Sequence, residues 1–598
     1  MSRDSPPAVQ RLRTDILILG SGGAGLFAAL HAHQADPSLS ITVAVKGLLG
    51  KSGCTRMVQG GYNVALAEGD SIERHFMDTI EGSKWLADQD LAWTLVTKAV
   101  ERIHELENEL GCFFDRNPDG TIHQKAFAGQ TFDRTVHKGD LTGIEIINRL
   151  AEQVWVRGIH RLEEHRAIEL VPTADGSAIA GVLMIDMRTG GYAFVQAKAV
   201  LLATGGGPTM YKYHTPSGDK SCDGLAMALR AGLSLRDMEM VQFHPTGLLA
   251  GGGTRMTGTV LEEGLRGAGG WLLNGHRERF MQGYHPNGER ATRDVVSRAI
   301  YAEMRAGRGT PKGGVYIQMH HLGADKVRRQ FKGMVERCED CGFDLAGGLV
   351  EVVPTAHYMM GGVVFRLDCT TSLHGLYAAG EDTGGVHGAN RLGGNGVANS
   401  TVFGGLAGES MAAAMKAGLQ FRNHDEEAIR RAITCHEKPF TNNVTGPAGG
   451  SVVDLCAIRE DLYSVMWEDV GILRTGAGLA RALERLAALD VDLARCALPD
   501  DDRAFNLSWH DWINLRNLIA VSRTIAAAAL SREDSRGAHF REDFPGTDEL
   551  ADSTFTVVAQ EQGGLALRRE PVAFNRVRPG ETLIPRTAKD GTERTPVG

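Results

Sequence analysis

The chain has 598 residues, more than one hydrophobic core usually serves, so the sequence predicts several domains. Its formal net charge of −9, without a long basic run, excludes a general attraction to nucleic acid. No stretch approaches the roughly 20 apolar residues that span a bilayer, and the polar N-terminus lacks a signal-peptide core. We therefore expect a cytoplasmic protein that meets a membrane only through partner subunits. The nine cysteines lack disulfide or metal-ligand spacing, which predicts reduced thiols and no metal site.

A glycine-rich turn follows the first apolar segment of the chain. Residues 15–19 (Asp-Ile-Leu-Ile-Leu) read as a strand, and residues 26–30 (Leu-Phe-Ala-Ala-Leu) read as the start of a helix. Between them, Gly20 permits a tight turn, Gly22 lets the backbone approach a pyrophosphate, and Gly25 lets helix and strand pack closely. The pattern predicts a nucleotide site at the N-terminus of this helix.

The next elements predict a nucleotide-binding domain that an insertion divides. Residues 13–235 alternate short apolar strands with helical stretches, and a second strand runs into a glycine turn at Thr204. Residues 236–350 are richer in loops containing Gly, His and Arg, and read as an inserted domain. Strand-and-turn character returns over residues 351–420, where we expect a helix from about Thr401 to Ala417.

The remainder of the chain is predicted to be helical and then loose. Residues 421–545 carry apolar positions at helical spacing, which is typical of a packed helical bundle. One stripe contains Leu479, Leu483, Leu486 and Leu489, and a second contains Leu515, Leu518, Ile519, Ser522, Ile525 and Ala526. Residues 546–598 are polar and punctuated by proline, so we expect a C-terminal tail.

Several motifs resemble the flavoprotein subunit of the succinate dehydrogenase and fumarate reductase family, with L-aspartate oxidases as relatives. The resemblance runs from the first glycine turn to Ser535-Arg536-Gly537-Ala538-His539. Its motifs are Gln59-Gly60-Gly61, Gln242-Phe243-His244-Pro245-Thr246-Gly247, Arg293-Asp294-Val295-Val296-Ser297-Arg298, His357-Tyr358-Met359-Met360-Gly361-Gly362 and His387-Gly388-Ala389-Asn390-Arg391-Leu392-Gly393-Gly394-Asn395. The resemblance implies an α/β fold in which a split Rossmann-like FAD-binding domain carries an inserted α+β capping domain and is followed by a helical bundle.

The resemblance also implies that the cofactor is FAD and that the electron partner is an iron–sulfur subunit. Lys46 stands where many dinucleotide folds carry an acidic ribose ligand, and the family lacks that acid too. The positions that match the family's flavin contacts are Gly20, Ser21, Gly22, Gly23, Ala24, Gly25, Lys46, Ser52, Cys54, Thr55, Gln59, Gly60, Gly61, Thr204, Gly205, Asp223, Glu381, Gly396 and Val397.

Other matched positions would bind and protonate a dicarboxylate. Two carboxylates need several converging donors, and arginine is suited to bidentate carboxylate binding. The substrate positions are His244, Glu262, His357, Arg391 and Phe127. Reduction of a double bond beside a carboxylate also needs a proton, and the resemblance assigns the donor to Arg293 and the relay that reprotonates it to Glu263 and Arg266.

Three departures from the family pattern change the expectations. Cys54 replaces the histidine that links FAD covalently, so we expect noncovalent FAD and a chemistry that leans towards reduction or towards a substrate easier to oxidise than succinate. Glu262 replaces a substrate-binding threonine, and an ionised carboxylate facing a substrate carboxylate is unfavourable unless it is protonated or turned away. Ala268 replaces a glutamate of the relay segment.

Two other functions are compatible with these motifs. An L-aspartate oxidase would share the fold, the arginine donor and noncovalent FAD but would use oxygen. The segment His123-Gln124-Lys125-Ala126-Phe127-Ala128-Gly129-Gln130 resembles the dehydrogenases instead. A flavin-binding electron-transfer subunit without dicarboxylate chemistry is the second alternative, which the retention of Arg293, His244, His357 and Arg391 disfavours.

Overall fold

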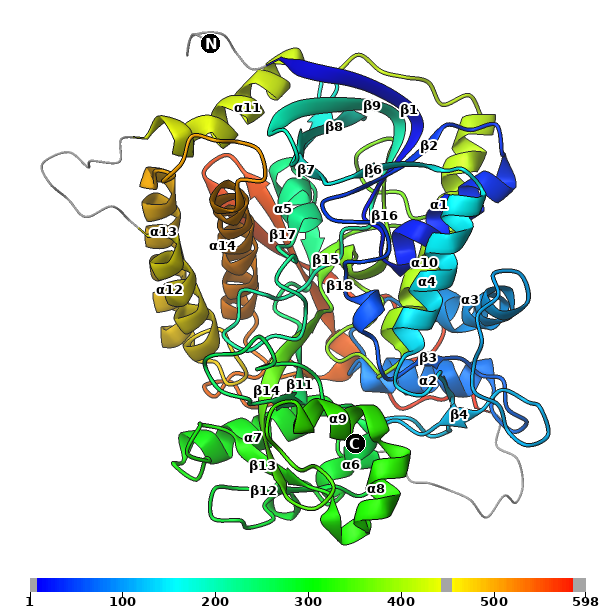
Figure 1. The fold of residues 1–598 in the computed structure, drawn as a ribbon, viewed down its shortest axis with the longest axis vertical. Helices are drawn as coiled ribbons and strands as arrows, with labels where there is room; N and C mark the ends of the chain where they lie inside the picture. Colours follow the sequence, from blue (N-terminus) through cyan, green and yellow to red (C-terminus); the bar gives the residue numbers. More distant parts are fainter. Residues whose placement is uncertain (1–7, 443–453, 585–598) are drawn as a thin grey trace, which may run out of the picture.

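A seven-stranded sheet organises the first part of the chain. The computed structural model describes residues 8–442 and 454–584 (Figure 1). The sheet has the spatial order β6 (His160–Glu163), β2 (Ile41–Val45), β1 (Val9–Leu19), β9 (Gly191–Leu202), β8 (Ile179–Asp186) and β7 (His165–Pro172), and β16 (Leu376–Ala378) also pairs with β9. The strands β6, β2, β1, β9 and β16 run parallel, whereas β8 and β7 continue the sheet as an antiparallel pair.

The parallel strands end together at one edge of the sheet. Leu19 in β1 lies opposite Leu202 in β9, and Leu202 lies opposite Ala378 in β16. Leu19 also lies opposite Ala44, one residue before the end of β2. This register brings the segments that follow all four strands to the same edge, which is where ligands bind in open α/β sheets.

Helix α1 (Gly23–Ala35) is covered on both sides. Its first ten residues, 23–32, are all buried, as expected of a helix that is apolar all round. α10 (Asn395–Lys416) packs along it so closely that a Cβ atom at Gly408 would lie 2.3 Å from the carbonyl oxygen of Ala28. We expected α10 to begin near Thr401. That boundary was wrong, because the glycines that read as loop continue into the first turn of the helix.

Further helices and a small sheet complete this domain. The helices are α2 (Ile72–Gly82), α3 (Gln89–Asn108), α4 (Thr142–Val156) and α5 (Asp223–Arg230). The small sheet has the order β3 (Tyr62–Asn63), β5 (Thr135–Val136) and β4 (Gln124–Lys125). β4 faces the inserted domain, as described below for the site.

The inserted domain is built on its own antiparallel sheet and lies at one end of the molecule (Figure 1). The sheet has the order β11 (Val241–Leu248), β14 (Leu349–Met359), β13 (Val315–Gln318) and β12 (Trp271–Leu273). Its helices are α6 (Gly264–Gly267), α7 (Arg293–Arg305), α8 (Ala324–Gln330) and α9 (Lys332–Glu339). The domain therefore extends past the boundary expected at residue 350, because β14 is the central strand that pairs with both β11 and β13. We call it the cap domain.

The segment 546–584 is not a tail, which corrects the expectation for residues 546–598. It contains the hairpin of β17 (Thr554–Glu561) and β18 (Gly564–Pro571), and β17 pairs with β10 (Leu235–Arg236), which in turn pairs with β15 (Gly362–Val363). Most of β17 is buried, so its sequence lacks the alternation of apolar and polar residues by which a half-buried strand is recognised. Residues 585–598, the end of the expected tail, lie outside the described part.

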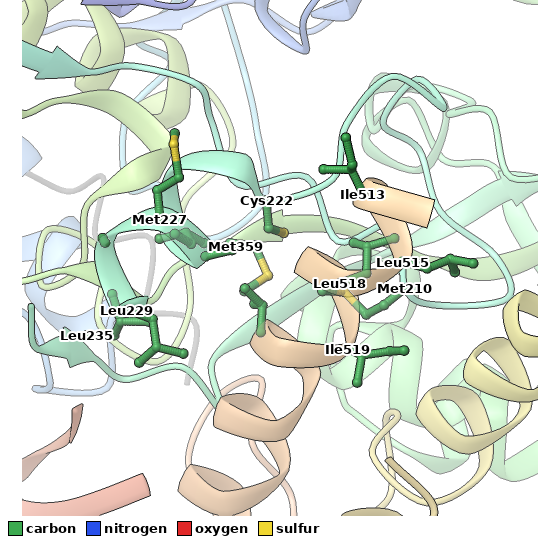
Figure 2. Close-up of a cluster of buried hydrophobic side chains, with 14 of the residues drawn as sticks. Met210, Cys222, Met227, Leu229, Leu235, Met359, Ile513, Leu515, Leu518 and Ile519 are labelled. Atoms are coloured by element: carbon green, nitrogen blue, oxygen red, sulfur yellow. The ribbon is translucent and has the colours of Figure 1, made fainter. Parts of the chain in front are cut away.

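Four helices occupy residues 421–442 and 454–545, the described part of this region. They are α11 (Glu426–Thr441), α12 (Leu455–Glu468), α13 (Gly476–Arg495) and α14 (Leu507–Ser531). α14 joins them to the nucleotide-binding domain, since Ile513, Leu518 and Ile519 share one hydrophobic cluster with Met227 and Leu229 of α5 (Figure 2). Among residues 8–442 and 454–584, no helix has both the length and the hydrophobicity needed to cross a membrane.

The correction at the C-terminus can be tested by substitution. Val558 is fully buried and pairs with Leu235 in β10. Val558→Asp should lower the free energy of unfolding by about 3 kcal/mol, because it buries an unpaired carboxylate. Gln560→Asp, at an exposed position of the same strand, should change stability little. Equal thermal unfolding of both variants and wild type would show that the hairpin does not pack as described.

Candidate active site

A first pocket lies at the shared edge of the parallel strands. It is lined by the residues that follow β1, β2 and β9, together with the start of α5. Seven of the predicted cofactor residues line it: Gly20, Ser21, Gly22, Lys46, Ser52, Thr204 and Asp223. The strand register explains this convergence, because residues separated by up to about 200 positions follow strands that end at the same level.

The glycine turn before α1 has the geometry that a pyrophosphate needs. Gly20 has a φ of +112°, and a Cβ atom there would lie 2.2 Å from the carbonyl oxygen of Ala203. A Cβ atom at Gly25 would lie 2.0 Å from the carbonyl oxygen of Gly20, so this position fixes the approach of helix and turn. At Gly22 the nearest protein atom would be 3.6 Å away, which leaves that face of the backbone open to a ligand. The N-cap residue of α1, Gly22, makes no side-chain cap in the described structure, and the Thr55 hydroxyl accepts the N–H of Gly23 at 3.1 Å. The positive end of the helix dipole therefore borders the pocket, where it favours an anion.

Charged side chains form part of the wall of this pocket. The Asp223 carboxylate accepts hydrogen bonds from Lys46 Nζ at 2.8 Å, Arg166 Nη2 at 2.8 Å and Asn517 Nδ2 at 2.8 Å. Burial disfavours the Asp223 carboxylate, but the cations Arg166 and Lys46 outweigh it and lower its pKa. Because Asn517 belongs to α14, the helical region contributes directly to this end of the site.

A second, larger cavity of about 470 Å³ lies between the nucleotide-binding domain and the cap domain. The predicted residues that line it are Cys54, Thr55, Gln59, Gly60, Gly61, Phe127, His244, Glu262, Glu263, Arg293, His357, Glu381, Arg391, Gly396 and Val397. The residue just before α10 and the first residues of α10 line this cavity. The end of the motif at residues 387–395 and the N-terminus of α10 therefore lie at the same place.

Two arginines share one buried carboxylate on the cap side of this cavity. Arg293, the first residue of α7, donates from Nε at 2.8 Å and from Nη2 at 2.6 Å to the Oε2 atom of Glu263. The other oxygen of Glu263 lies 3.5 Å from Nη2 of Arg266. Burial would raise the pKa of Glu263, but Arg293 and Arg266 outweigh it and hold that pKa below its usual value. Arg266 continues the chain by donating to the carbonyl oxygen of Glu289 at 2.7 Å.

A glutamine joins this group to an arginine of the other domain. The Oε1 atom of Gln242 accepts from Arg293 Nη1 at 3.2 Å and from Arg391 Nη2 at 3.0 Å. The Arg391 guanidinium also lies over the ring of Tyr358, 4.3 Å from its centroid. Burial, with Arg293 nearby, lowers the pKa of Arg391 to about 10, so it remains a cation at neutral pH.

Two histidines of the cavity are neutral. Burial and the guanidinium of Arg293 hold the pKa values of His244 and His357 well below 6.5. Nδ1 of His244 accepts the backbone N–H of Thr246 at 3.3 Å, so its ring proton lies on Nε2. His357 Nδ1 lies 2.8 Å from the hydroxyl oxygen of Thr215. Each ring can therefore offer one hydrogen bond without adding charge.

Glu262 is neither exposed to solvent nor isolated. Its side chain is 8% exposed and lines the cavity, and its Oε2 atom lies 3.4 Å from Nζ of Lys125 in β4. Burial raises the pKa of Glu262, and Lys125 opposes that shift. The carboxylate that the sequence left without a partner is thus paired across the boundary between the two domains.

Cys54 lies in the wall of the cavity that belongs to the nucleotide-binding domain. Burial, reinforced by the carboxylate of Glu381, raises the pKa of its thiol to about 12. Its neighbour Thr55 accepts the backbone N–H of Gly23 at 3.1 Å and so connects this wall to α1. Glu381 itself accepts the backbone N–H of Met359 at 2.9 Å.

The remaining predicted residues lie just behind the two pockets. They are Gly23, Ala24, Gly25, Gly205 and Arg266, of which Gly23, Gly25 and Arg266 contact the lining residues Thr55, Gly20 and Glu263. Sequence reasoning missed Gln242, although it stands two residues before His244 in the same motif. It also missed Lys125 and Arg166, whose partners lie far away in the sequence, so no local signal pointed to them.

Comparisons with known proteins agree with this geometry. Residues 15–397 match a family described as FAD binding domain, and residues 459–584 match one described as fumarate reductase flavoprotein C-term. A subunit of the fumarate reductase (CoM/CoB) of Methanothermobacter marburgensis is 41% identical over 536 residues, which cover 89% of this chain and 95% of that protein. The fumarate reductase flavoprotein subunit of Escherichia coli is 35% identical over 565 residues, covering 92% of this chain and 91% of that protein.

A solved structure extends the similarity to the whole fold. The FrdA chain of an E. coli quinol fumarate reductase variant superposes with a TM-score of 0.88 at 33% identity, covering 96% of this chain and 99% of that one. The predicted fold class, a split FAD-binding domain with an inserted cap and a helical C-terminal region, is confirmed. FAD is the cofactor, and the open backbone at Gly22 beside the N-terminus of α1 fits its pyrophosphate.

Two glycine substitutions should separate stability from cofactor binding. Gly25→Ala places a Cβ against the Gly20 carbonyl, so we expect a loss of roughly 1 to 3 kcal/mol in folding stability. Gly22→Ala meets no protein atom closer than 3.6 Å, so the FAD-free protein should unfold at the wild-type temperature while FAD binds more weakly. Thermal unfolding and FAD titration measure both. Wild-type FAD affinity in Gly22→Ala would place the pyrophosphate elsewhere.

We predict that FAD is held without a covalent bond. The Cys54 thiol stands at the position of the family's linking histidine, and its raised pKa leaves almost no thiolate to attack the flavin at neutral pH. Acid precipitation should release all of the yellow colour into the supernatant. Flavin that remains on the chain, with a matching mass increase on the peptide containing Cys54, would show a thioether link instead.

Proposed function

Because the chain belongs to the family of succinate dehydrogenase and fumarate reductase flavoprotein subunits, FAD oxidoreductases that act on CH–CH bonds, we propose that it transfers a hydride between FAD and a dicarboxylate such as fumarate or succinate. The observation that carries the proposal is the convergence of Arg293, Arg391, His244 and His357 on one cavity beside the cofactor-binding elements.

The charge of this cluster suits a dianion. Arg293, Arg391 and Arg266 supply three guanidinium groups, and Glu263 supplies one carboxylate, while both histidines are neutral. The cluster therefore carries a positive excess before the substrate enters. Arginine forks and neutral imidazole N–H groups are donors that can hold carboxylates in a fixed orientation.

The same residues can move a proton. When bound, FAD supplies or accepts the hydride at the substrate carbon that faces it. In the reductive direction Arg293 would donate a proton to the neighbouring carbon, and the carboxylate of Glu263, 2.6 Å from Arg293, would return one. Arg266, 3.5 Å from the other oxygen of Glu263, extends this path away from the cavity. At neutral pH neither arginine would release a proton to water. A carboxylate that contacts both guanidinium groups can carry a proton between them.

The pairing of Glu262 supports a plain dicarboxylate. An unpaired carboxylate in this wall would favour a substrate with an amine at that end. Lys125 already supplies the opposite charge, so a cationic group on the substrate is not required. This favours succinate or fumarate over an amino acid such as aspartate.

We also infer that the electron partner is a protein with iron–sulfur clusters. Relatives of this chain are named as subunits of fumarate reductases, including an 8-methylmenaquinol:fumarate reductase of Wolinella succinogenes. A membrane would be reached through such partners. Co-purification of the full chain with a cysteine-rich subunit from its own cells tests this inference, and recovery of the flavoprotein alone with full quinol-linked activity would contradict it.

Arg293→Lys tests the proposed function at its centre. Lysine keeps the charge but lacks the fork that contacts both Glu263 and Gln242. We expect fumarate reduction by reduced viologen dye to fall by roughly 10²- to 10⁴-fold, with the flavin spectrum unchanged. Arg305→Lys on the same helix, 49% exposed and paired with Glu542, is the matched control and should retain activity. Wild-type activity in Arg293→Lys would exclude Arg293 as the proton donor.

A further inference from the structure

The cavity wall beside the arginine cluster contains charges that the proposed reaction does not use. Glu262 lines the wall, and its backbone N–H contacts Met334 Sδ at 3.5 Å, which fixes the start of the side chain. Lys125 reaches its carboxylate from β4 in the other domain. Of these two residues, only Glu262 lines the cavity, so Lys125 lies behind it.

Each element around Glu262 contributes a charge. β4 contributes Lys125, the loop before α4 contributes Asp140, and α9 contributes Arg337. Arg337 donates to the carbonyl oxygen of Val260 at 2.9 Å and, with the Gln59 amide turned to present its oxygen, also to Gln59 at 3.0 Å. Arg337 is therefore committed to the backbone and to Gln59, whereas Lys125 is the cation in contact with Glu262.

Removing Lys125 would leave the buried Glu262 carboxylate without the cation that contacts it. The Glu262 side chain is 8% exposed and that of Lys125 is 21% exposed, so water screens the pair poorly. A substrate carboxylate that enters the cavity would then be repelled by Glu262. The pair also spans the boundary between the nucleotide-binding and cap domains, so the wall is neutral only when both domains are in the arrangement seen here.

Resting on the proposed dicarboxylate function, we propose that Lys125 is a positioning residue that determines specificity: its ammonium group neutralises Glu262 and thereby allows the cavity to accept a dianion. Lys125 acts through Glu262 and need not touch the substrate. The proposal explains how a chain that lost the family's substrate-binding threonine can still bind a dicarboxylate.

Lys125→Met tests this through binding. Malonate, a nonreactive dicarboxylate, is titrated into the FAD-loaded protein and followed by the flavin absorbance. We expect Kd to rise by roughly 10- to 100-fold, and KM for fumarate to rise with it while kcat changes less. Lys138→Met, which removes an exposed lysine paired with Asp115, is the control and should leave both unchanged.

The pH dependence and a double variant distinguish electrostatics from structure. Without Lys125 the pKa of Glu262 rises further, so Glu262 becomes neutral as the pH falls, and malonate affinity in Lys125→Met should recover towards the wild-type value at low pH. Lys125→Met/Glu262→Gln should restore affinity at all pH values. A single variant that binds weakly and is not restored by Glu262→Gln would show a structural role for Lys125 and overturn the proposal.

Failure of the proposal and failure of the proposed function give different results. If wild type neither binds malonate nor reduces fumarate, the dicarboxylate function is wrong and the proposal falls with it. If wild type binds malonate and Lys125→Met binds it equally well, the proposal alone is wrong. If Lys125→Met fails to hold FAD, Glu262→Gln alone tests the proposal. This variant should bind malonate at least as tightly as wild type, because Lys125 is then free to attract the dianion. Weaker binding would contradict the proposal.

Discussion

The buried carboxylate of Glu263, held between the guanidinium groups of Arg293 and Arg266, is the interaction on which the site depends. Without it, Arg293 at the start of α7 and Arg266 in α6 would be buried without the carboxylate that pairs with both, which is strongly unfavourable. With it, Arg293 is fixed at the N-terminus of its helix and can share Gln242 with Arg391. This one carboxylate thus stabilises the two buried arginines in a cavity that keeps a positive excess suited to an anionic ligand.

Two features of the fold bring the Arg293–Glu263–Arg266 group close to the cofactor-binding elements. The parallel strands end at one edge and place the glycine turn, Lys46 and Thr204 around a single pocket. The cap domain then closes over the adjacent cavity, with the Arg293 group facing the first residues of α10. The proposed hydride transfer would need both at once, because the flavin-binding elements belong to one domain and Arg293, the proposed proton donor, to the other.

Much of this arrangement could be predicted from the sequence, and the failures have physical causes. The glycine turn is encoded locally, and the predicted steric roles of Gly20 and Gly25 agree with their backbone contacts. Arg293 and Arg391 stand in recognisable motifs, Glu263 was matched through the family resemblance, and the structure places all three around one cavity. The Lys125–Glu262 pair joins positions 137 residues apart, and no local pattern records such a contact. The C-terminal hairpin was taken for a tail because its buried strand pairs with a distant two-residue strand, β10.

A crystal structure of the FAD-loaded protein with bound malonate tests the central claim most directly. We expect one carboxylate on Arg391 and His357, the other facing His244 and Glu262, and the central carbon between the flavin and Arg293, with the Lys125–Glu262 pair intact. Malonate bound away from Arg293 and Arg391, or a cavity that excludes it at saturating concentration, would show that this cluster is not a dicarboxylate site.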